Sequence, residues 1–378
     1  MKKLLFLCLF LLCPISVYAD DLIPNASSGM LIEASSGKVI YEKNKEKRLS
    51  VASMTKMVAQ IIIMEELEKG KIKLNDVVTV SKNASDMGGS QIYLEEGEKI
   101  SVEDLIKGIS ISSGNDATVA MAEYISGSEE KFVKRMNDKV KELNLKNTHF
   151  SNCTGLDEKN HYSSAEDMSI IAKDLVINHS KILKYSSIYE DYLREDTNRK
   201  FWLVNTNKLI SGYEGTDGLK TGHTDDAGYC LAATTKRNNI RLIAIVLGEK
   251  ESKVRNKETM ELLDYGFKNI KVKTLKKKGA VIKKEYLKKA NTLYVEAKLK
   301  NDLNVVYDKG DNSKYKYKVK LNNLSFPIEK NQVIGKIKVI SNNKKITEED
   351  LVSSFTISKL SLRDYYKNNL INFFYGYF

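Results

Sequence analysis

The chain has 378 residues, enough for two domains of the usual size of about 100 to 200 residues each. Its 61 Lys and Arg residues outnumber its 49 Asp and Glu residues, which gives a formal net charge of +12. A basic chain suits an anionic envelope or membrane surface, and nucleic acid is the rival partner. The first residues argue against nucleic acid, because their pattern directs the chain out of the compartment where nucleic acid is found.

Residues 1–19 have the pattern of a cleaved signal peptide. Two lysines precede an apolar stretch from Leu4 to Leu12, and Val17-Tyr18-Ala19 provides a small-residue cleavage site. The apolar stretch is about half of the roughly 20 residues that a membrane-spanning helix needs, which makes an uncleaved anchor the weaker interpretation. We therefore predict export, with cleavage after Ala19.

Two cysteines, Cys153 and Cys230, remain after the signal peptide. Two thiols do not make the disulfide framework of a small secreted scaffold. A chain of this length can build its own large core, so we expect both cysteines to be free and buried; a disulfide between them is the alternative.

Residues 20–267 mix short strands with long helices and predict an α+β domain. Strands are expected at 30–33, 38–41, 228–235 and 241–247, and helices at 53–68, 102–109, 117–124, 129–143 and 165–176. Because strands lie at both ends of this segment, we expect the two ends to pair and complete one sheet, with the helices packed on it.

The pattern changes after Phe267. Lysines alternate with apolar residues, as in Tyr315–Leu321, and this period of two predicts a small antiparallel β-sandwich over 268–358. Residues 359–378 form an aromatic-rich end that places apolar side chains near one side of a helix. We expect this amphipathic helix to lie in a membrane surface, with packing on its own domain as the alternative.

Three short motifs follow one another along the chain: Ser53-Met54-Thr55-Lys56, Ser113-Gly114-Asn115 and Lys220-Thr221-Gly222. Each motif is weak alone, since Ser-x-x-Lys arises by chance in many chains of this size. The three in this order are a strong signal for a serine nucleophile with its supporting groups.

The first motif brings a hydroxyl and an amine together, because residues i and i+3 of a helix share a face. A lysine with its usual pKa of about 10.4 is a poor base. Burial beside the apolar run Met57–Met64, and a second cation such as Lys220, would lower the pKa of Lys56 and let it accept the Ser53 proton. The alternative is a Lys56 side chain that reaches solvent.

The second motif lies between two predicted helices. Ser113 can pass a proton to a leaving amine, Gly114 permits a tight turn, and Asn115 can hydrogen-bond a substrate amide. The alternative is capping of the following helix by Asn115 and Asp116, which this motif alone favours.

The third motif is expected to precede a strand. Lys220 and Thr221 supply a cation and a hydroxyl suited to a terminal carboxylate, and Gly222 allows a ligand to approach the backbone. The alternative is a lysine on a sheet edge.

Together the motifs resemble those of the serine penicillin-recognising enzymes. The longer strings 50–56 and 217–224, and pieces such as Gly88-Gly89-Ser90, are similar to those of the low-molecular-mass D-Ala-D-Ala carboxypeptidases, and the resemblance covers nearly the whole chain. It implies a β-lactamase/transpeptidase-like catalytic domain with an antiparallel sheet flanked by helices, a small all-β domain and a C-terminal amphipathic anchor. Such an enzyme acts at the outer face of the cytoplasmic membrane.

The same resemblance implies the chemistry and its residues. Ser53 attacks the carbonyl between two terminal D-alanines of a peptidoglycan stem peptide, and β-lactam antibiotics acylate it instead. Lys56 and Ser113 would be catalytic, Asn115, Lys220, Thr221, Gly222 and His223 would bind substrate, and the backbone N–H groups of Ser53 and His223 would hold the oxyanion. No cofactor is implied.

Several alternatives concern single residues. His223 as a general base is disfavoured because Ser53 already has a lysine, and Arg255 is a candidate second cation for the carboxylate. The histidines show no metal-ligand spacing, so we expect no metal. A β-lactamase would need an added carboxylate, and Glu166-Asp167 suits the first turn of a helix better. A DD-endopeptidase and a non-catalytic cell-wall binding protein complete the alternatives.

Overall fold

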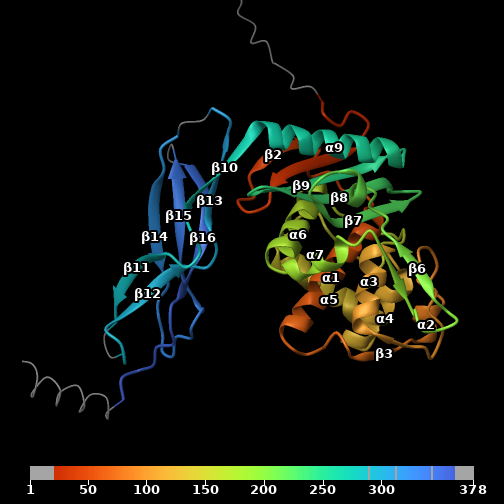
Figure 1. Cartoon of the computed structure of the whole chain (residues 1–378), viewed down its shortest axis with the longest axis horizontal. Coiled ribbons are helices and arrows are strands. Elements are labelled where there is room, and N and C mark those ends of the chain that lie inside the picture. The colour runs from red at the N-terminus through yellow and green to blue at the C-terminus, as the bar shows by residue number, and fades with distance from the viewer. Residues whose placement is uncertain (1–20, 288–289, 311–312, 342–343, 362–378) are drawn as a thin grey trace, which may run out of the picture.

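The computed structural model describes residues 21–287, 290–310, 313–341 and 344–361. The predicted signal peptide lies outside these ranges, and so does the predicted anchor helix except for residues 359–361, where Lys359 still pairs with Ala290. Within the described ranges, no helix combines the length and the apolar character that crossing a bilayer requires. Figure 1 shows an α+β body beside an all-β body, joined where α9 runs into β10.

A five-stranded antiparallel sheet in the order β2-β1-β9-β8-β7 forms the centre of the α+β domain. Its strands are β1 (Ser28–Glu33), β2 (Val39–Lys43), β7 (Thr216–Thr224), β8 (Gly228–Arg237) and β9 (Ile240–Glu249). β1 pairs with β9 in unbroken register from Ser28↔Leu247 to Glu33↔Leu242. The predicted closure of the sheet by both ends of the domain is therefore confirmed.

Helices cover both faces of this sheet (Figure 1), which explains why Leu242 to Leu247 of β9 are all buried. One face carries α9 (Ser252–Asn269). The other helices are α1 (Lys56–Glu68), α2 (Lys82–Ser85), α3 (Val102–Ile111), α4 (Asn115–Ser126), α5 (Glu129–Glu142), α6 (Ala165–Ile177), α7 (Leu183–Ser186) and α8 (Leu209–Gly212). The five predicted helices are confirmed as α1 and α3 to α6.

Two short antiparallel pairs complete the domain: β3 (Val77–Thr79) with β4 (Lys99–Ser101), and β5 (Glu190–Leu193) with β6 (Phe201–Val204). Cys153 and Cys230 are free and buried, as predicted.

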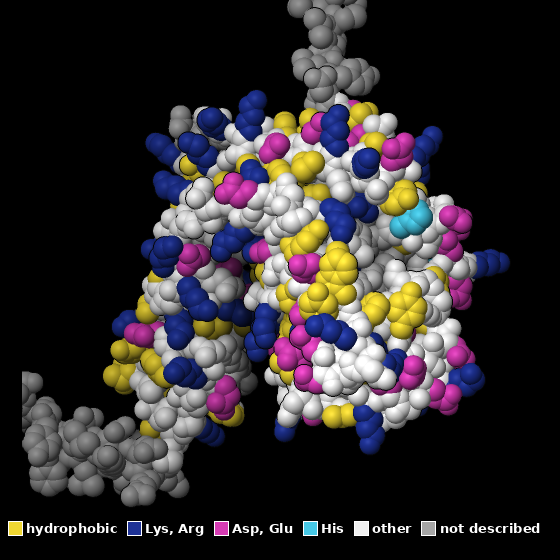
Figure 2. Space-filling model, turned by 45° about the vertical axis from the view of Figure 1, so that its right-hand side comes forward, with side chains coloured by type: hydrophobic (Ala, Val, Ile, Leu, Met, Phe, Trp, Pro, Cys, Tyr) yellow, Lys and Arg dark blue, Asp and Glu magenta, His cyan; other side chains and the backbone are white. Residues whose placement is uncertain are grey.

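The C-terminal domain is all-β and antiparallel. A pair of strands, β10 (Ile270–Lys276) and β13 (Leu303–Asp308), faces a sheet in the order β11-β12-β16-β15-β14. The sheet is built from β11 (Val281–Tyr286), β12 (Tyr294–Leu299), β14 (Lys316–Leu321), β15 (Val333–Ser341) and β16 (Lys344–Ser353). One core holds Val295, Leu299, Val305, Ile337 and Leu351 from four strands. Figure 2 shows Lys and Arg side chains spread over this domain, as the alternation predicts.

Candidate active site

The turn that carries Ser53 holds its hydroxyl against Lys56. Ala52–Thr55 form a 3₁₀ turn, and α1 begins at Lys56. Side chains at i and i+3 of a 3₁₀ turn eclipse, which brings Lys56 Nζ to 2.8 Å from Ser53 Oγ. Ala52, directly before the serine, has a φ of 46°, a conformation that L residues rarely adopt outside functional sites.

Lys56 is fully buried, with 0% of its side chain exposed. Its Nζ lies 2.6 Å from Asn115 Oδ1 and 2.6 Å from the Thr154 carbonyl oxygen, in addition to Ser53. Burial lowers the pKa of Lys56 to about 7, because the apolar surroundings disfavour its charged form. The alternative of a solvent-reaching side chain is therefore wrong.

Ser113 and Asn115 lie where α3 gives way to α4. Ser113 has a φ of 64°, and its Oγ is buried without a hydrogen-bond partner among the described residues. The Asn115 side chain does not cap α4. It bridges instead, since its oxygen faces Lys56 and its Nδ2 donates to the Gly88 carbonyl at 2.7 Å. Asp116 accepts from the backbone N–H of Ile92 and Leu94, away from the cleft.

Lys220-Thr221-Gly222 lies within β7, at the edge of the sheet, and it precedes β8, the strand predicted at 228–235. That the motif is itself part of a strand was not predicted. The strand escaped detection because two glycines and a lysine interrupt its apolar pattern. A Cβ at Gly222 would lie 2.6 Å from the Val51 carbonyl oxygen, so only glycine lets β7 pack this closely on the Ser53 turn.

Three basic side chains, Lys56, Lys220 and Arg255, lie close to the serine. Lys220 is 1% exposed, and burial, together with Lys56 and Arg255, lowers its pKa well below the usual value. Its Nζ donates to the Thr221 carbonyl at 3.0 Å. Arg255 comes from α9 and is 5% exposed. No Asp or Glu is among the described residues that line the cleft, so the cleft is electropositive.

The cleft has a volume of about 280 Å³ and brings together all three motifs, with Ser53, Ser113, Thr221, Gly222 and His223 in its wall. Arg255 lines it too. Ser90, Thr206, Tyr229 and Ser252 complete the wall; Thr206 was not recognised from the sequence, although its Oγ1 accepts from Thr221 Oγ1 at 2.7 Å. The exposed His223 ring stacks on Tyr229 with 4.0 Å between centroids.

The remaining candidates do not enter the cleft. Glu166 lies in the first turn of α6, where Ser164 caps the helix, and forms an ion pair with Lys45 at 3.7 Å. The first-turn interpretation of Glu166-Asp167 is therefore confirmed. Within the part of the chain that the structure describes, no three His, Cys, Asp or Glu side chains form a metal-binding group.

Comparisons with known proteins agree with this geometry. Residues 17–251 match the family model of D-alanyl-D-alanine carboxypeptidases, and residues 271–359 match that of the penicillin-binding protein 5 C-terminal domain. D-alanyl-D-alanine carboxypeptidase DacF of Bacillus subtilis is 46% identical over 353 residues, covering 93% of this chain and 90% of the relative. D-alanyl-D-alanine carboxypeptidase DacA of Escherichia coli is 35% identical, and the match covers 89% of this chain and 87% of the relative.

Solved structures show the same fold. Penicillin binding protein 5 from Haemophilus influenzae superposes with a TM-score of 0.70 at 33% identity, covering 89% of this chain and 98% of that one. The Streptomyces K15 DD-transpeptidase superposes with a TM-score of 0.60 at 27% identity. The match covers 65% of this chain and 97% of the transpeptidase.

A transpeptidase-like catalytic domain followed by an all-β domain defines a serine hydrolase of the penicillin-recognising class. Within that class, the chain belongs to the D-alanyl-D-alanine carboxypeptidase family of serine peptidases, S11. The resemblance seen in the motifs is thereby confirmed, and the activity is that of a D-alanyl-D-alanine carboxypeptidase.

Proposed function

We propose that Ser53 is the nucleophile and Lys56 its base in removing the terminal D-alanine of peptidoglycan stem peptides. The observation that carries this assignment is the set of contacts around Lys56 Nζ. A neutral amine has two N–H groups and one lone pair. Donation to Asn115 Oδ1 and to the Thr154 carbonyl uses both N–H groups, which leaves the lone pair for the Ser53 hydroxyl at 2.8 Å.

The reaction then proceeds in two halves. Ser53 Oγ bonds to the carbonyl carbon while its proton passes to Lys56, and the C–N bond breaks as the leaving amine takes a proton through Ser113. The buried Ser113 Oγ has no partner among the described residues and is free to bond to that amine. Water then hydrolyses the ester on Ser53. A β-lactam ring opened by Ser53 gives the corresponding penicilloyl ester.

The electropositive wall selects a chain terminus. Thr221 and Arg255 line the cleft and offer a hydroxyl and a cation to the substrate carboxylate, and the buried Lys220 next to Thr221 adds a second basic group. Asn115 hydrogen-bonds the substrate amide beside the scissile bond. The backbone N–H groups of Ser53 and His223 hold the oxyanion, and the close approach of Gly222 to the Ser53 turn supports this role.

The place of action follows from the two ends of the chain. The signal peptide pattern of residues 1–19 exports the enzyme, and the amphipathic segment 359–378 holds it on the outer face of the cytoplasmic membrane, in the cell envelope. The basic β domain adds attraction to anionic lipid. Deleting 362–378 should release the enzyme from liposomes while its activity on a soluble peptide is retained. A truncated enzyme that binds liposomes as tightly as the intact one would contradict this anchor.

Mass spectrometry tests the site itself. The purified chain is incubated with benzylpenicillin, and then separately with a peptide that ends in D-Ala-D-Ala. We expect one penicilloyl adduct on Ser53 and release of D-alanine, and Ser53→Ala should lose both. Ser50→Ala is the matched control, since that hydroxyl lies three residues away and donates to Asp157. An adduct that persists in Ser53→Ala would refute the assignment.

A further inference from the structure

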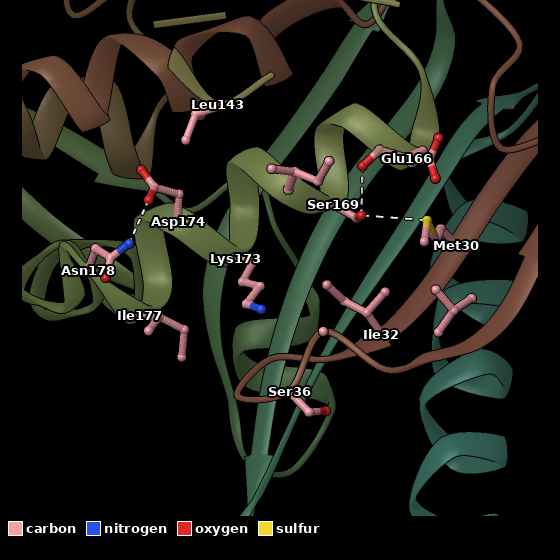
Figure 3. Close-up of a pocket in the computed structure, with 13 residues that line it drawn as sticks. Met30, Ile32, Ser36, Leu143, Glu166, Ser169, Lys173, Asp174, Ile177 and Asn178 are labelled. Carbon is pink, nitrogen blue, oxygen red and sulfur yellow. Dashed lines mark hydrogen bonds between the residues drawn. The ribbon is translucent and has the colours of Figure 1, made fainter. Parts of the chain in front are cut away.

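A second cavity lies far from the cleft, on the side of the α+β domain that faces the β domain (Figures 1 and 3). Its volume is about 460 Å³, within the range typical of small-molecule sites. None of the residues that line it also lines the cleft. It adjoins two cavities that both domains line, sharing Ser36 and Gly37 with one and Ile177 with the other.

The wall of this cavity is mainly apolar. α6 forms one side, and β1, β2 and the turn between them form the other. Six apolar side chains line it: Met30, Ile32, Val39, Leu143, Ile170 and Ile177. Such a lining favours a ligand with an apolar body.

Three charged residues accompany the apolar ones, and two of them have partners. Glu166 pairs with Lys45 at 3.7 Å, and Asp174 accepts from Asn178 Nδ2 at 2.6 Å. Lys173 is different, since its half-buried amine has no hydrogen bond or ion pair with any described residue. Figure 3 shows its side chain reaching from α6 into the cavity, between Ile177 and Ile32.

Glu33, a carboxylate outside the wall whose charge acts on Lys173, is already hydrogen-bonded elsewhere. Glu33 accepts from the hydroxyls of Ser35 and Ser36 and from the Ser36 N–H, at 2.7 to 2.9 Å. Burial lowers the pKa of Lys173, and the charges of Glu33 and Glu349 oppose this shift only in part. Lys173 Nζ lies close to Gly37, and a Cβ added at that residue would come within 2.9 Å of the amine and crowd it.

We propose that this cavity binds a small organic monoanion, a carboxylate on an aliphatic body, with its head on Lys173 Nζ and its body against the apolar wall. The single cation matches one negative charge. The neighbouring carboxylates Glu33, Glu166 and Asp174 repel a dianion such as phosphate. The proposal does not depend on the roles assigned to Ser53 and Lys56.

Decanoate, below its micelle concentration, is the probe, and decanol is its uncharged counterpart. The full mature chain is labelled with ¹³C-methyl methionine, and the Met30 signal, assigned with Met30→Leu, reports on the cavity wall. We expect a saturable shift of that signal with decanoate. Lys173→Met should weaken decanoate binding about tenfold or more, because a charge-assisted contact is lost, and should leave decanol unaffected.

Two variants keep the test decisive. Lys173→Arg retains the cation and should bind decanoate within a few-fold of the native chain. Lys181→Met removes an exposed lysine eight positions along the chain and should change nothing. Thermal melts establish that each variant is folded. The proposal is overturned if the Met30 signal does not respond to decanoate, or if Lys173→Met binds it as tightly as the native chain does.

Discussion

Acylation of Ser53 should depend on pH through Lys56. The pKa of Lys56 is lowered to about 7 by burial, and in the proposed mechanism the neutral amine accepts the serine proton. With that pKa, about one tenth of the amine is neutral at pH 6 and about nine tenths at pH 8. An exposed lysine with a pKa of about 10.4 would be neutral in roughly one molecule in 2,500 at pH 7.

The expected result is a rise of about tenfold in the second-order rate of acylation between pH 6 and pH 8, followed by a plateau. Stopped-flow measurement of acylation by benzylpenicillin, with the adduct quantified by mass, gives this profile directly. Lys56→Arg should lower the plateau by roughly 10²- to 10⁴-fold, since arginine cannot lose its proton at working pH. A native profile that is flat from pH 6 to pH 8, or a Lys56→Arg variant within tenfold of the native rate, would refute the role of Lys56 as base.

The other predictions concern three further positions. Lys220→Arg keeps a cation for the carboxylate and should raise KM more than it lowers kcat, whereas equal and complete loss in Lys220→Arg and Lys56→Arg would contradict separate roles. Gly222→Ala places a Cβ 2.6 Å from the Val51 carbonyl oxygen and should reduce acylation at least tenfold; an unchanged rate would show that β7 can move away. Burial, and then Glu258, raise the pKa of Glu249 to about 8, so its folded form holds a proton that the unfolded chain loses near pH 4.5. The free energy of unfolding should therefore fall from pH 5 to pH 8. In urea unfolding, Glu249→Gln should become more stable relative to the native chain as the pH rises over that range. A stability difference between the two chains that does not change with pH would exclude Glu249 as the cause.

Much of this site was accessible from the sequence because it depends on side-chain types at fixed spacing. Ser53 and Lys56 follow from helical periodicity, and the motif at Ser113 was placed correctly between two helices. The Thr154 carbonyl was not accessible, because a backbone acceptor leaves no residue-type pattern. Thr206 was missed for a related reason, since a single threonine after a short strand has no distinguishing spacing.

The fold was predicted where burial follows a simple period. β1, β8 and β9 have apolar runs, and their pairing follows from strands at both ends of the domain. α9 was missed because its buried face includes Arg255, Glu258 and Thr259 beside its leucines, so no apolar stripe marks it. One of these polar residues, Arg255, lines the cleft, whereas Glu258 accepts from Asn25 and Ala26.

The chemistry of Lys56 and the packing of α1 have one physical origin. Residues Lys56 to Met64 are all buried, and this apolar environment lowers the pKa of Lys56 so that a large share of the amine is neutral near neutral pH. Burying Lys56, Lys220 and Arg255 together costs folding free energy. Among the described residues of the cleft wall there is no carboxylate to pair with them. A substrate that brings a terminal carboxylate into the cleft supplies the missing anion. Its binding thus offsets a cost already present in the folded enzyme, whereas a peptide whose terminal carboxyl is amidated leaves the cations unpaired.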